Sequence, residues 1–359
     1  MTAPSLDVGG NVSGVATVVR ELMKELTRDR AVTVEHVLLG RSDRDGAPRT
    51  PVSQMYDAFR QVRRSRVEGL RVILHVNTAL NDRSIVRDTV LVLYAKFLRI
   101  PVLVHIHGGK YYDHQIPLIL RVVLRLAINF ANGVMVLGES ERIKLSNFVL
   151  CHTPIVSLPN AITVPDISTS RRRKSKSVIN FVFLGRLEEE KGLEDFLEVL
   201  KSEPELASRS TLEIFGDGSL AGELVPRFAA VLGDRFRYGG RLMIADKYEV
   251  LAKYDVLVLP SRRGEGLPMA MLEAMSVGVV PIAPYMASIP EVVEHLISGF
   301  LFTTGQIDSL RACFLMAHQN SQQLEEMGRR AREVVVARHS IGPYADAMME
   351  IYSRVTSRG

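Results

Sequence analysis

Residues 260–278 read PSRRGEGLPMAMLEAMSVG, and they follow a strand-like apolar run at residues 255–259. Pro268 suits the first turn of a helix, so Glu265 is expected on the strand-to-helix loop and Glu273 little more than one helical turn beyond Pro268. Open parallel sheets bind ligands at the carboxyl ends of their strands, where both carboxylates could accept hydrogen bonds from ribose and sugar hydroxyls. A nucleotide-sugar fits that geometry. The alternative is two glutamates on a solvated helix face.

Apolar runs of strand length alternate with helical patterns along the chain, which predicts parallel α/β sheets. The expected strands cover residues 71–76, 101–106, 133–137, 178–184, 212–215, 255–259 and 279–283. The segment ITVPDISTSRRRKSKSV, rich in Pro, Ser and basic residues, interrupts this alternation. It predicts an interdomain linker near residues 161–177.

Length and composition narrow the class of protein. A chain of 359 residues, 47% of them hydrophobic, can bury two cores. Only Cys151 and Cys313 are present and no charged-then-apolar leader opens the chain, so we expect a cytoplasmic protein. Charged residues interrupt each apolar run before the ~20 residues of a spanning helix, which predicts a soluble or peripheral protein. The formal net charge of +5 indicates an anionic partner.

Nucleic acid is not expected to be that partner. The basic run RRRKSK has no interleaved aromatic residues, so a solvated loop is favoured over a nucleic-acid patch. Phospholipid and a diphosphate substrate remain as anionic partners.

Several motifs of the second half follow strand-like runs in the same way as residues 260–278. They are FVFLGRLEEEKGL, FGDGSL, FRYGGRL, DVLVLPS and PEVVEHLISGFLF. Together they resemble the retaining nucleotide-sugar glycosyltransferases of family 4, also called glycosyl transferases group 1, whose signature run is close to EGLPMALLEAMA. The resemblance is strong over residues 178–303 and weaker before them. Among the members of this family, the chain resembles bacterial enzymes of polysaccharide assembly.

The resemblance implies the GT-B fold, with two Rossmann-like domains facing across a cleft. We expect an acceptor-binding domain at 1–165, a nucleotide-sugar-binding domain at 166–341 and a terminal helix at 342–359 that returns to the first domain. The apolar positions of that helix recur at helical spacing. The implied reaction is retaining transfer of a hexose from a nucleoside-diphosphate sugar to a glycan acceptor.

The resemblance also implies a donor site. Arg186 and Lys191 would hold the diphosphate, Arg bidentately and Lys as a compact charge. Without the family pattern they would be ordinary surface cations. Glu265 would position the donor and support developing positive charge. The remaining donor-binding residues are Gly14, Gly216, Gly240, Arg241, Gly266, Leu267 and Glu273. No Asp-x-Asp motif among residues 178–303, where the resemblance is strong, marks a metal site, so we expect neither a metal nor another cofactor.

The amino terminus departs from the family pattern. Gly9, Gly10 and Gly14 crowd a loop before a helix for which Ser13 is the expected N-cap, and such a loop offers backbone amides to a phosphate. In the resembled family a complete strand precedes this loop, whereas only MTAPSLDV does so here. We therefore expect a truncated first strand and a natural start roughly ten residues upstream, because a central parallel strand is hard to omit.

The run HIHGGKYYDH, residues 105–114, follows another expected strand. The resemblance places His107 close to the transferred sugar as a catalytic residue, and Lys110, Tyr111 and Tyr112 could shape the acceptor mouth. The alternative for His107 is a strand-end histidine bonded to the backbone. For His105 the structural role is preferred.

The acceptor is less defined. Residues 117–130 are apolar but carry Arg121 and Arg125, and further arginines cluster at residues 60–71. A basic, partly apolar domain suits an anionic inner membrane face and a lipid-diphosphate-linked acceptor. A core helix at 117–130 is equally compatible. Two other functions stay open, a sugar-nucleotide epimerase or phosphorylase of the same fold and a non-catalytic protein that binds nucleotide-sugars.

Overall fold

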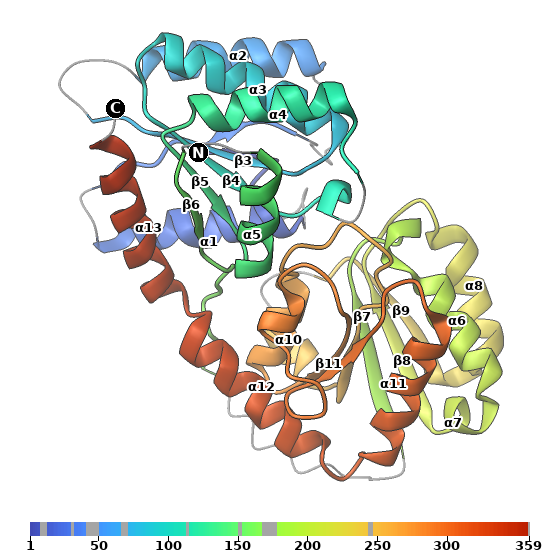
Figure 1. The fold of residues 1–359 in the computed structure, drawn as a ribbon. Helices are drawn as coiled ribbons and strands as arrows, with labels where there is room; N and C mark the ends of the chain where they lie inside the picture. The colour runs from blue at the N-terminus through green and yellow to red at the C-terminus, as the bar shows by residue number, and fades with distance from the viewer. Residues whose placement is uncertain are drawn as a thin grey trace. The chain divides into compact units, whose positions relative to one another are not determined.

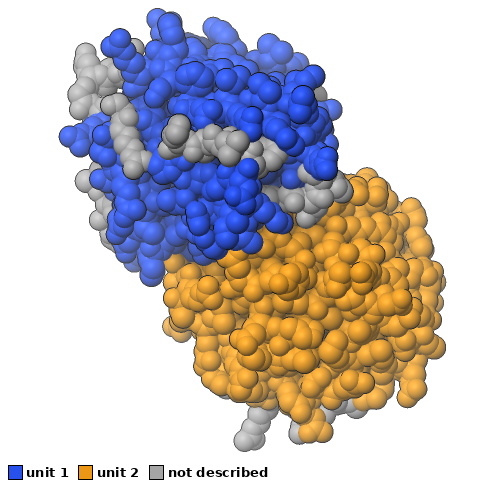
Figure 2. Space-filling view, in the orientation of Figure 1, with its two compact units in different colours: residues 1–163, 341–359 blue, residues 164–340 orange. Residues whose placement is uncertain are grey.

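The computed structural model describes residues 1–7, 13–29, 32–40, 50–65, 71–112, 115–149, 153–166, 178–242 and 247–357. The chain divides into two compact units (Figures 1 and 2). The first unit combines Met1–Thr163 with Ile341–Gly359, and the second is Val164–Ser340. Each unit contains one parallel six-stranded sheet with helices around it, so the α/β fold class is confirmed. The segments 8–12 and 167–177, which contain Gly9, Gly10 and most of the expected linker, lie outside the described residues.

The sheet of the first unit has the strand order β2-β1-β3-β4-β5-β6. Its strands are β1 (Thr2–Ala3), β2 (Val37–Leu38), β3 (Leu74–Thr78), β4 (Val102–Ile106), β5 (Gly133–Val136) and β6 (Ile155–Ser157). Every residue of β3, β4 and β5 is buried, as expected for parallel strands covered on both faces. The strand β1 is two residues long and pairs with β2 on one side and with β3 on the other.

The helices of the first unit cover both faces of this sheet (Figure 1). They are α1 (Gly14–Asp29), α2 (Pro51–Arg64), α3 (Asp82–Phe97), α4 (Leu118–Phe130), α5 (Glu139–Val149) and α13 (Ile341–Thr356), with a 3-10 turn η1 at Lys110–Tyr112. The predicted N-cap of α1 is confirmed, because Ser13 Oγ accepts a hydrogen bond from Ala16 N at 3.3 Å. The terminal helix α13 packs against α1, and Tyr352 Oη lies 2.8 Å from His75 Nδ1 of β3.

The sheet of the second unit has the strand order β12-β11-β10-β7-β8-β9. Its strands are β7 (Ile179–Leu184), β8 (Ser210–Phe215), β9 (Phe236–Gly240), β10 (Val256–Val258), β11 (Val280–Pro284) and β12 (Phe300–Phe302). The chain moves outward from β7 to β9 and then returns to place β10 on the other side of β7. This reversal makes a topological switch point between β7 and β10, the place where open α/β sheets bind ligands.

Helices of the second unit close its core around the buried rings of Phe181, Phe196 and Phe314, whose centroids lie 5.4 to 5.9 Å apart. They are α6 (Leu193–Ser202), α7 (Pro204–Ser208), α8 (Ala221–Leu232), α9 (Lys247–Leu251), α10 (Met269–Ser276), α11 (Ile307–Gln319) and α12 (Leu324–Arg338). Short 3-10 turns lie at η2 (Glu189–Lys191), η3 (Gly233–Arg235) and η4 (Ile289–Glu291). Over the described part of the chain, no helix is long and apolar enough to cross a membrane.

Candidate active site

The candidate site lies at the switch point of the second unit. The loop after β7 carries Arg186 and leads to η2 with Lys191, and the loop after β10 carries Glu265. Because β7 and β10 are neighbours and parallel, both loops leave the same edge of the sheet. Arg186 and Lys191 therefore lie close to Glu265, although Lys191 and Glu265 are 74 residues apart in the sequence.

Backbone contact and an ion-pair network hold these two loops together. Arg262 N donates to Glu190 O at 2.9 Å, and a Cβ on Gly192, whose φ is +65°, would lie 2.0 Å from Pro260 O. The close approach therefore requires glycine at position 192.

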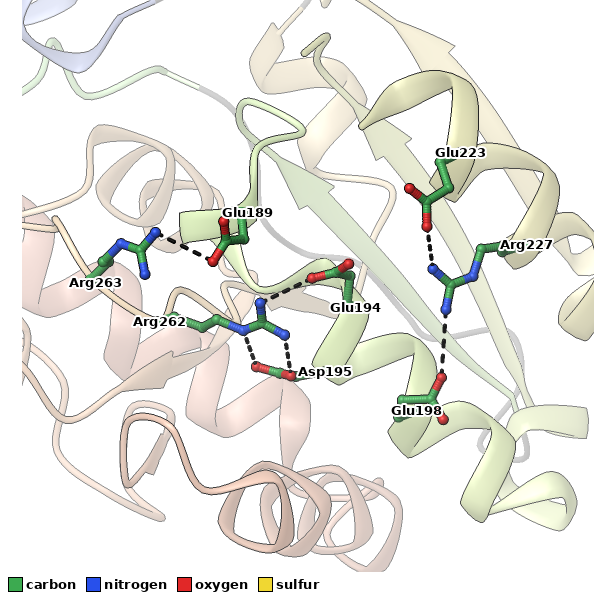
Figure 3. A network of polar contacts seen from close by, with 8 residues as sticks. All are labelled: Glu189, Glu194, Asp195, Glu198, Glu223, Arg227, Arg262 and Arg263. Carbon is green, nitrogen blue, oxygen red and sulfur yellow. Dashed lines mark hydrogen bonds and ion pairs between the residues drawn. The ribbon is translucent and has the colours of Figure 1, made fainter. Parts of the chain in front are cut away.

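The Arg262 guanidinium clamps the loop onto the start of α6 (Figure 3). Its Nε and Nη2 donate to the two carboxylate oxygens of Asp195 at 2.8 and 2.6 Å, and Nη1 donates to Glu194 at 3.0 Å. Hydrogen bonding by Asp195 raises the pKa of Arg262 above its usual range, so the clamp stays charged. Lys191 and Glu265 thus project from a braced pair of loops.

Lys191 and Glu265 form a nearly buried ion pair. Lys191 Nζ lies 2.5 Å from Glu265 Oε1, and Ser261 Oγ donates to the same oxygen at 2.6 Å. Burial by itself raises the pKa of Glu265, but the charge and hydrogen bond of Lys191, the Ser261 hydroxyl and the charge of Arg186 together lower it. The Glu265 carboxylate is therefore ionised at neutral pH. Sequence reasoning missed Ser261, whose only signal is its position just after the strand.

Arg186 lies on the solvent side of this pair. Its Nη2 donates to Glu190 Oε1 at 3.1 Å, and its side chain is 48% exposed. An exposed pair of this kind is weak, so the guanidinium can exchange Glu190 for another anion at small cost.

Glu273 lies on α10, which begins directly after Pro268. It is 4% exposed and accepts a hydrogen bond from Lys247 Nζ of α9 at 2.6 Å. Lys247 is itself 8% exposed, and it was not among the residues expected from the sequence. The signal was its position one turn before the buried Leu251, on the inward face of α9. Gly266 and Leu267, between the two glutamates, are buried in the loop.

Backbone groups continue the same sheet edge. Gly216 N, after β8, donates to Gly240 O at 2.7 Å, and Tyr238 Oη donates to Gly216 O at 2.9 Å. A Cβ on Gly216 would lie 1.7 Å from Gly185 O, so only glycine allows this approach. Arg241 Nη2 reaches Asp217 Oδ2 at 3.3 Å on the surface.

The other expected site residues belong to the first unit. His107 follows β4, and its Nε2 lies 2.6 Å from Asn77 Oδ1. Asn77 Nδ2 donates to Thr2 O at 2.7 Å, so Oδ1 must be the acceptor and His107 Nε2 the donor. Burial lowers the pKa of His107 to about 3. The ring is therefore neutral at neutral pH, and its Nδ1 can accept a hydrogen bond from a hydroxyl group but cannot donate one.

The expected acceptor residues lie on η1. Lys110 Nζ lies 2.5 Å from Asp82 Oδ2 and 4.8 Å from the Tyr111 ring centroid, and the Tyr111 hydroxyl also donates to Asp82. Hydrogen bonds from Lys110 and Tyr111 lower the pKa of Asp82. The side chain of Tyr112 lies outside the described residues. Gly14 is the exposed first residue of α1.

A metal site was not expected. Within the described ranges, His, Cys, Asp and Glu side chains do not gather in groups of three or more that could hold a metal ion. Independence from metal remains a prediction.

Comparison with known proteins matches the second unit to a family and the whole chain to a fold. Residues 167–334 match the family model of glycosyl transferases group 1. The amylovoran biosynthesis glycosyltransferase AmsK of Erwinia amylovora is 28% identical over 163 residues, which cover 44% of this chain and 40% of the relative. The Escherichia coli UDP-Gal:alpha-D-GlcNAc-diphosphoundecaprenol alpha-1,3-galactosyltransferase is 29% identical over 177 residues, which cover 48% of this chain and 44% of that enzyme.

The fold comparison extends over nearly the full length. The sucrose-phosphate synthase of Thermosynechococcus elongatus has a TM-score of 0.79 at 16% identity, covering 100% of this chain and 98% of that structure. The fold is therefore of the GT-B type. The sequence matches to the two curated relatives span less than half of their lengths.

Proposed function

We propose that this chain, whose residues 167–334 match the family model of glycosyl transferases group 1, is a retaining glycosyltransferase of polysaccharide biosynthesis. It would move a hexose from a nucleoside-diphosphate sugar to a glycan acceptor. The observation that carries the proposal is the braced Lys191–Glu265 pair at the switch point, with Arg186 beside it. It combines cations for a diphosphate with an ionised carboxylate.

The cations suit the leaving group. An ammonium group has three N–H donors, and Lys191 uses one of them at 2.5 Å on Glu265. Two donors remain for phosphate oxygens, and Arg186 can add a bidentate contact when it leaves Glu190. The diphosphate would then depart as a neutralised group without a divalent ion. This is why we propose transfer that is independent of metal.

The carboxylates suit the sugar and the ribose. Glu265, ionised and held by Ser261 and Lys191, would orient the donor and stabilise positive charge at the anomeric carbon. Glu273 would accept hydrogen bonds from ribose hydroxyls, and the backbone near Gly216, Gly240 and Arg241 would lie along the base. Retention requires reaction on one face of the sugar, and the departing phosphate oxygen can take the proton of the acceptor hydroxyl there.

His107 fits an acceptor role for sugar hydroxyls. Its neutral ring accepts hydrogen bonds at Nδ1, because Nε2 is engaged with Asn77. Lys110 and Tyr111 would contribute to acceptor binding. We propose an acceptor linked to a lipid diphosphate, because the Escherichia coli relative is named for an acceptor linked to diphosphoundecaprenol. We also propose a cytoplasmic location at the inner membrane face.

A screen of nucleotide-sugars by thermal shift, followed by assay of donor hydrolysis and transfer, tests the proposal. We expect one donor to stabilise the protein and to be hydrolysed slowly without acceptor, and Glu265→Gln to bind it without turnover. The anomeric configuration of the product, read by NMR, tests retention. An epimerised nucleotide-sugar as product, or donor binding without any turnover, would replace the proposal by one of the two other functions.

A further inference from the structure

The outward face of α3 and α4 is apolar, although both helices already bury an apolar face inward. On α3 the exposed apolar side chains are Val86, Val90, Leu93 and Phe97. On α4 they are Leu118, Ile119, Val122, Leu126 and Phe130. These nine are between 37% and 82% exposed and make up nine of the seventeen exposed large apolar side chains among the described residues. An exposed apolar stripe of this extent is normally covered by another apolar phase.

The two stripes form one surface, called here the α3/α4 face. The helices pack against each other (Figure 1), and Thr89 Oγ1 of α3 lies 3.3 Å from Val123 O of α4. Their inward residues, such as Leu91 and Leu124, belong to one core cluster with Val76 and Val104 of the sheet. Both helices therefore cover the same side of the sheet, and their outer stripes face the same way.

Positive charge surrounds this surface. Residues 82–130 contain seven Arg and Lys against three Asp, a formal excess of four in a chain whose formal net charge is +5. Arg83, Lys96 and Arg99 are exposed. The aspartates of α3 are both paired, Asp82 with Lys110 at 2.5 Å and Asp88 with Arg87 at 2.6 Å. The charge therefore selects an anionic partner.

We infer that the α3/α4 face docks this protein on an anionic lipid bilayer. The apolar side chains insert at the boundary of headgroups and acyl chains. The exposed cations Arg83, Lys96 and Arg99, called here the basic rim, bind lipid phosphates. A second copy of the chain fits less well, because a symmetric contact would bring two positive rims together. The inference deepens the proposed function, since a lipid-linked acceptor lies in such a surface.

Vesicle flotation tests this inference. Wild-type protein is mixed with vesicles of phosphatidylglycerol and phosphatidylcholine, or of phosphatidylcholine alone, at about 0.1 M salt, where charge contacts persist. The variant Phe97→Glu/Ile119→Glu changes side chains that are 82% and 79% exposed, so its thermal unfolding should match the wild type. Val336→Glu, on α12 of the second unit and 46% exposed, is the matched control.

We expect wild type and Val336→Glu to bind the anionic vesicles and the double variant to bind at least roughly tenfold more weakly. Lys96→Glu/Arg99→Glu should lose the preference for phosphatidylglycerol. Absence of wild-type binding, or equal binding by the double variant, would overturn the inference. So would a concentration-dependent dimer that Phe97→Glu abolishes.

Donor binding separates this inference from the proposed function. The face variants should keep the wild-type thermal shift with the donor, because Arg186, Lys191 and Glu273, on which donor binding is proposed to depend, lie in the other unit. Vesicle binding by a protein without transferase activity would refute the proposed function and leave the docking face standing. Transfer to a soluble acceptor by a protein that does not bind vesicles would refute the docking face and leave the proposed function standing.

Discussion

Lys247→Met removes the positive partner of a buried carboxylate. Lys247 Nζ lies 2.6 Å from Glu273 Oε1, and the two side chains are only 11% and 6% exposed. Methionine keeps most of the length and apolar contact of the lysine stem but leaves Glu273 without that charge. Breaking one side of a buried pair typically costs about 3–5 kcal/mol. We therefore expect the free energy of unfolding to fall by this amount.

The loss is large enough to measure. At roughly 2–4 °C per kcal/mol for a domain of this size, the melting temperature should fall by roughly 6–20 °C. Circular dichroism during heating and urea unfolding at neutral pH would both report it. An unfolding curve like that of the wild type would refute the view that Lys247 compensates Glu273.

The double variant Lys247→Met/Glu273→Leu separates stability from binding. Replacing both members of a buried pair by apolar side chains is often neutral or stabilising, so most of the lost stability should return. Donor affinity should not return if Glu273 binds ribose, and calorimetry should show a loss of about 1.5–3 kcal/mol, roughly 10- to 150-fold. Wild-type donor affinity in the double variant would make Glu273 a purely structural residue.

Three further outcomes are expected. Arg186→Ala and Lys191→Ala should each weaken donor binding in calorimetry by about 1.5–3 kcal/mol. The control Arg227→Ala, which breaks an exposed pair with Glu223, should not weaken it. Unchanged donor affinity in the double variant Arg186→Ala/Lys191→Ala would refute the proposed diphosphate role. Folding lowers the pKa of His107 from 6.5 to about 3, so as pH falls the unfolded state takes up the proton first. The contribution of His107 to the free energy of unfolding is therefore complete above pH 6.5 and is lost as pH falls toward 3. In urea titrations, this protonation should lower the free energy of unfolding by about 1.4 kcal/mol between pH 7.5 and 5.5. The same pH dependence in His107→Asn would contradict this. Finally, transferase activity should persist in excess chelator, and loss that magnesium or manganese restores would count against metal independence.

Local patterns in the sequence predicted most of the fold. Each expected strand coincides with an observed one, with ends that shift by a few residues, because apolar runs between turn residues mark buried parallel strands. Ser13 and Pro268 predicted where α1 and α10 begin, since capping chemistry is local. The loop position of Glu265 and the helix position of Glu273 follow from the same local signals.

Partners across the chain were decided only by the tertiary structure. Lys191 reaches Glu265 across 74 residues, because strand order places their loops side by side, and Lys247 of α9 reaches Glu273 of α10 across 26. Local sequence patterns also did not determine which helix faces are buried. The apolar pattern of residues 117–130 was compatible with a core helix or a membrane-facing one, and α4 has buried residues on one side and exposed apolar residues on the other. Periodicity shows which residues share a face, but whether that face is covered depends on contacts with distant parts of the chain.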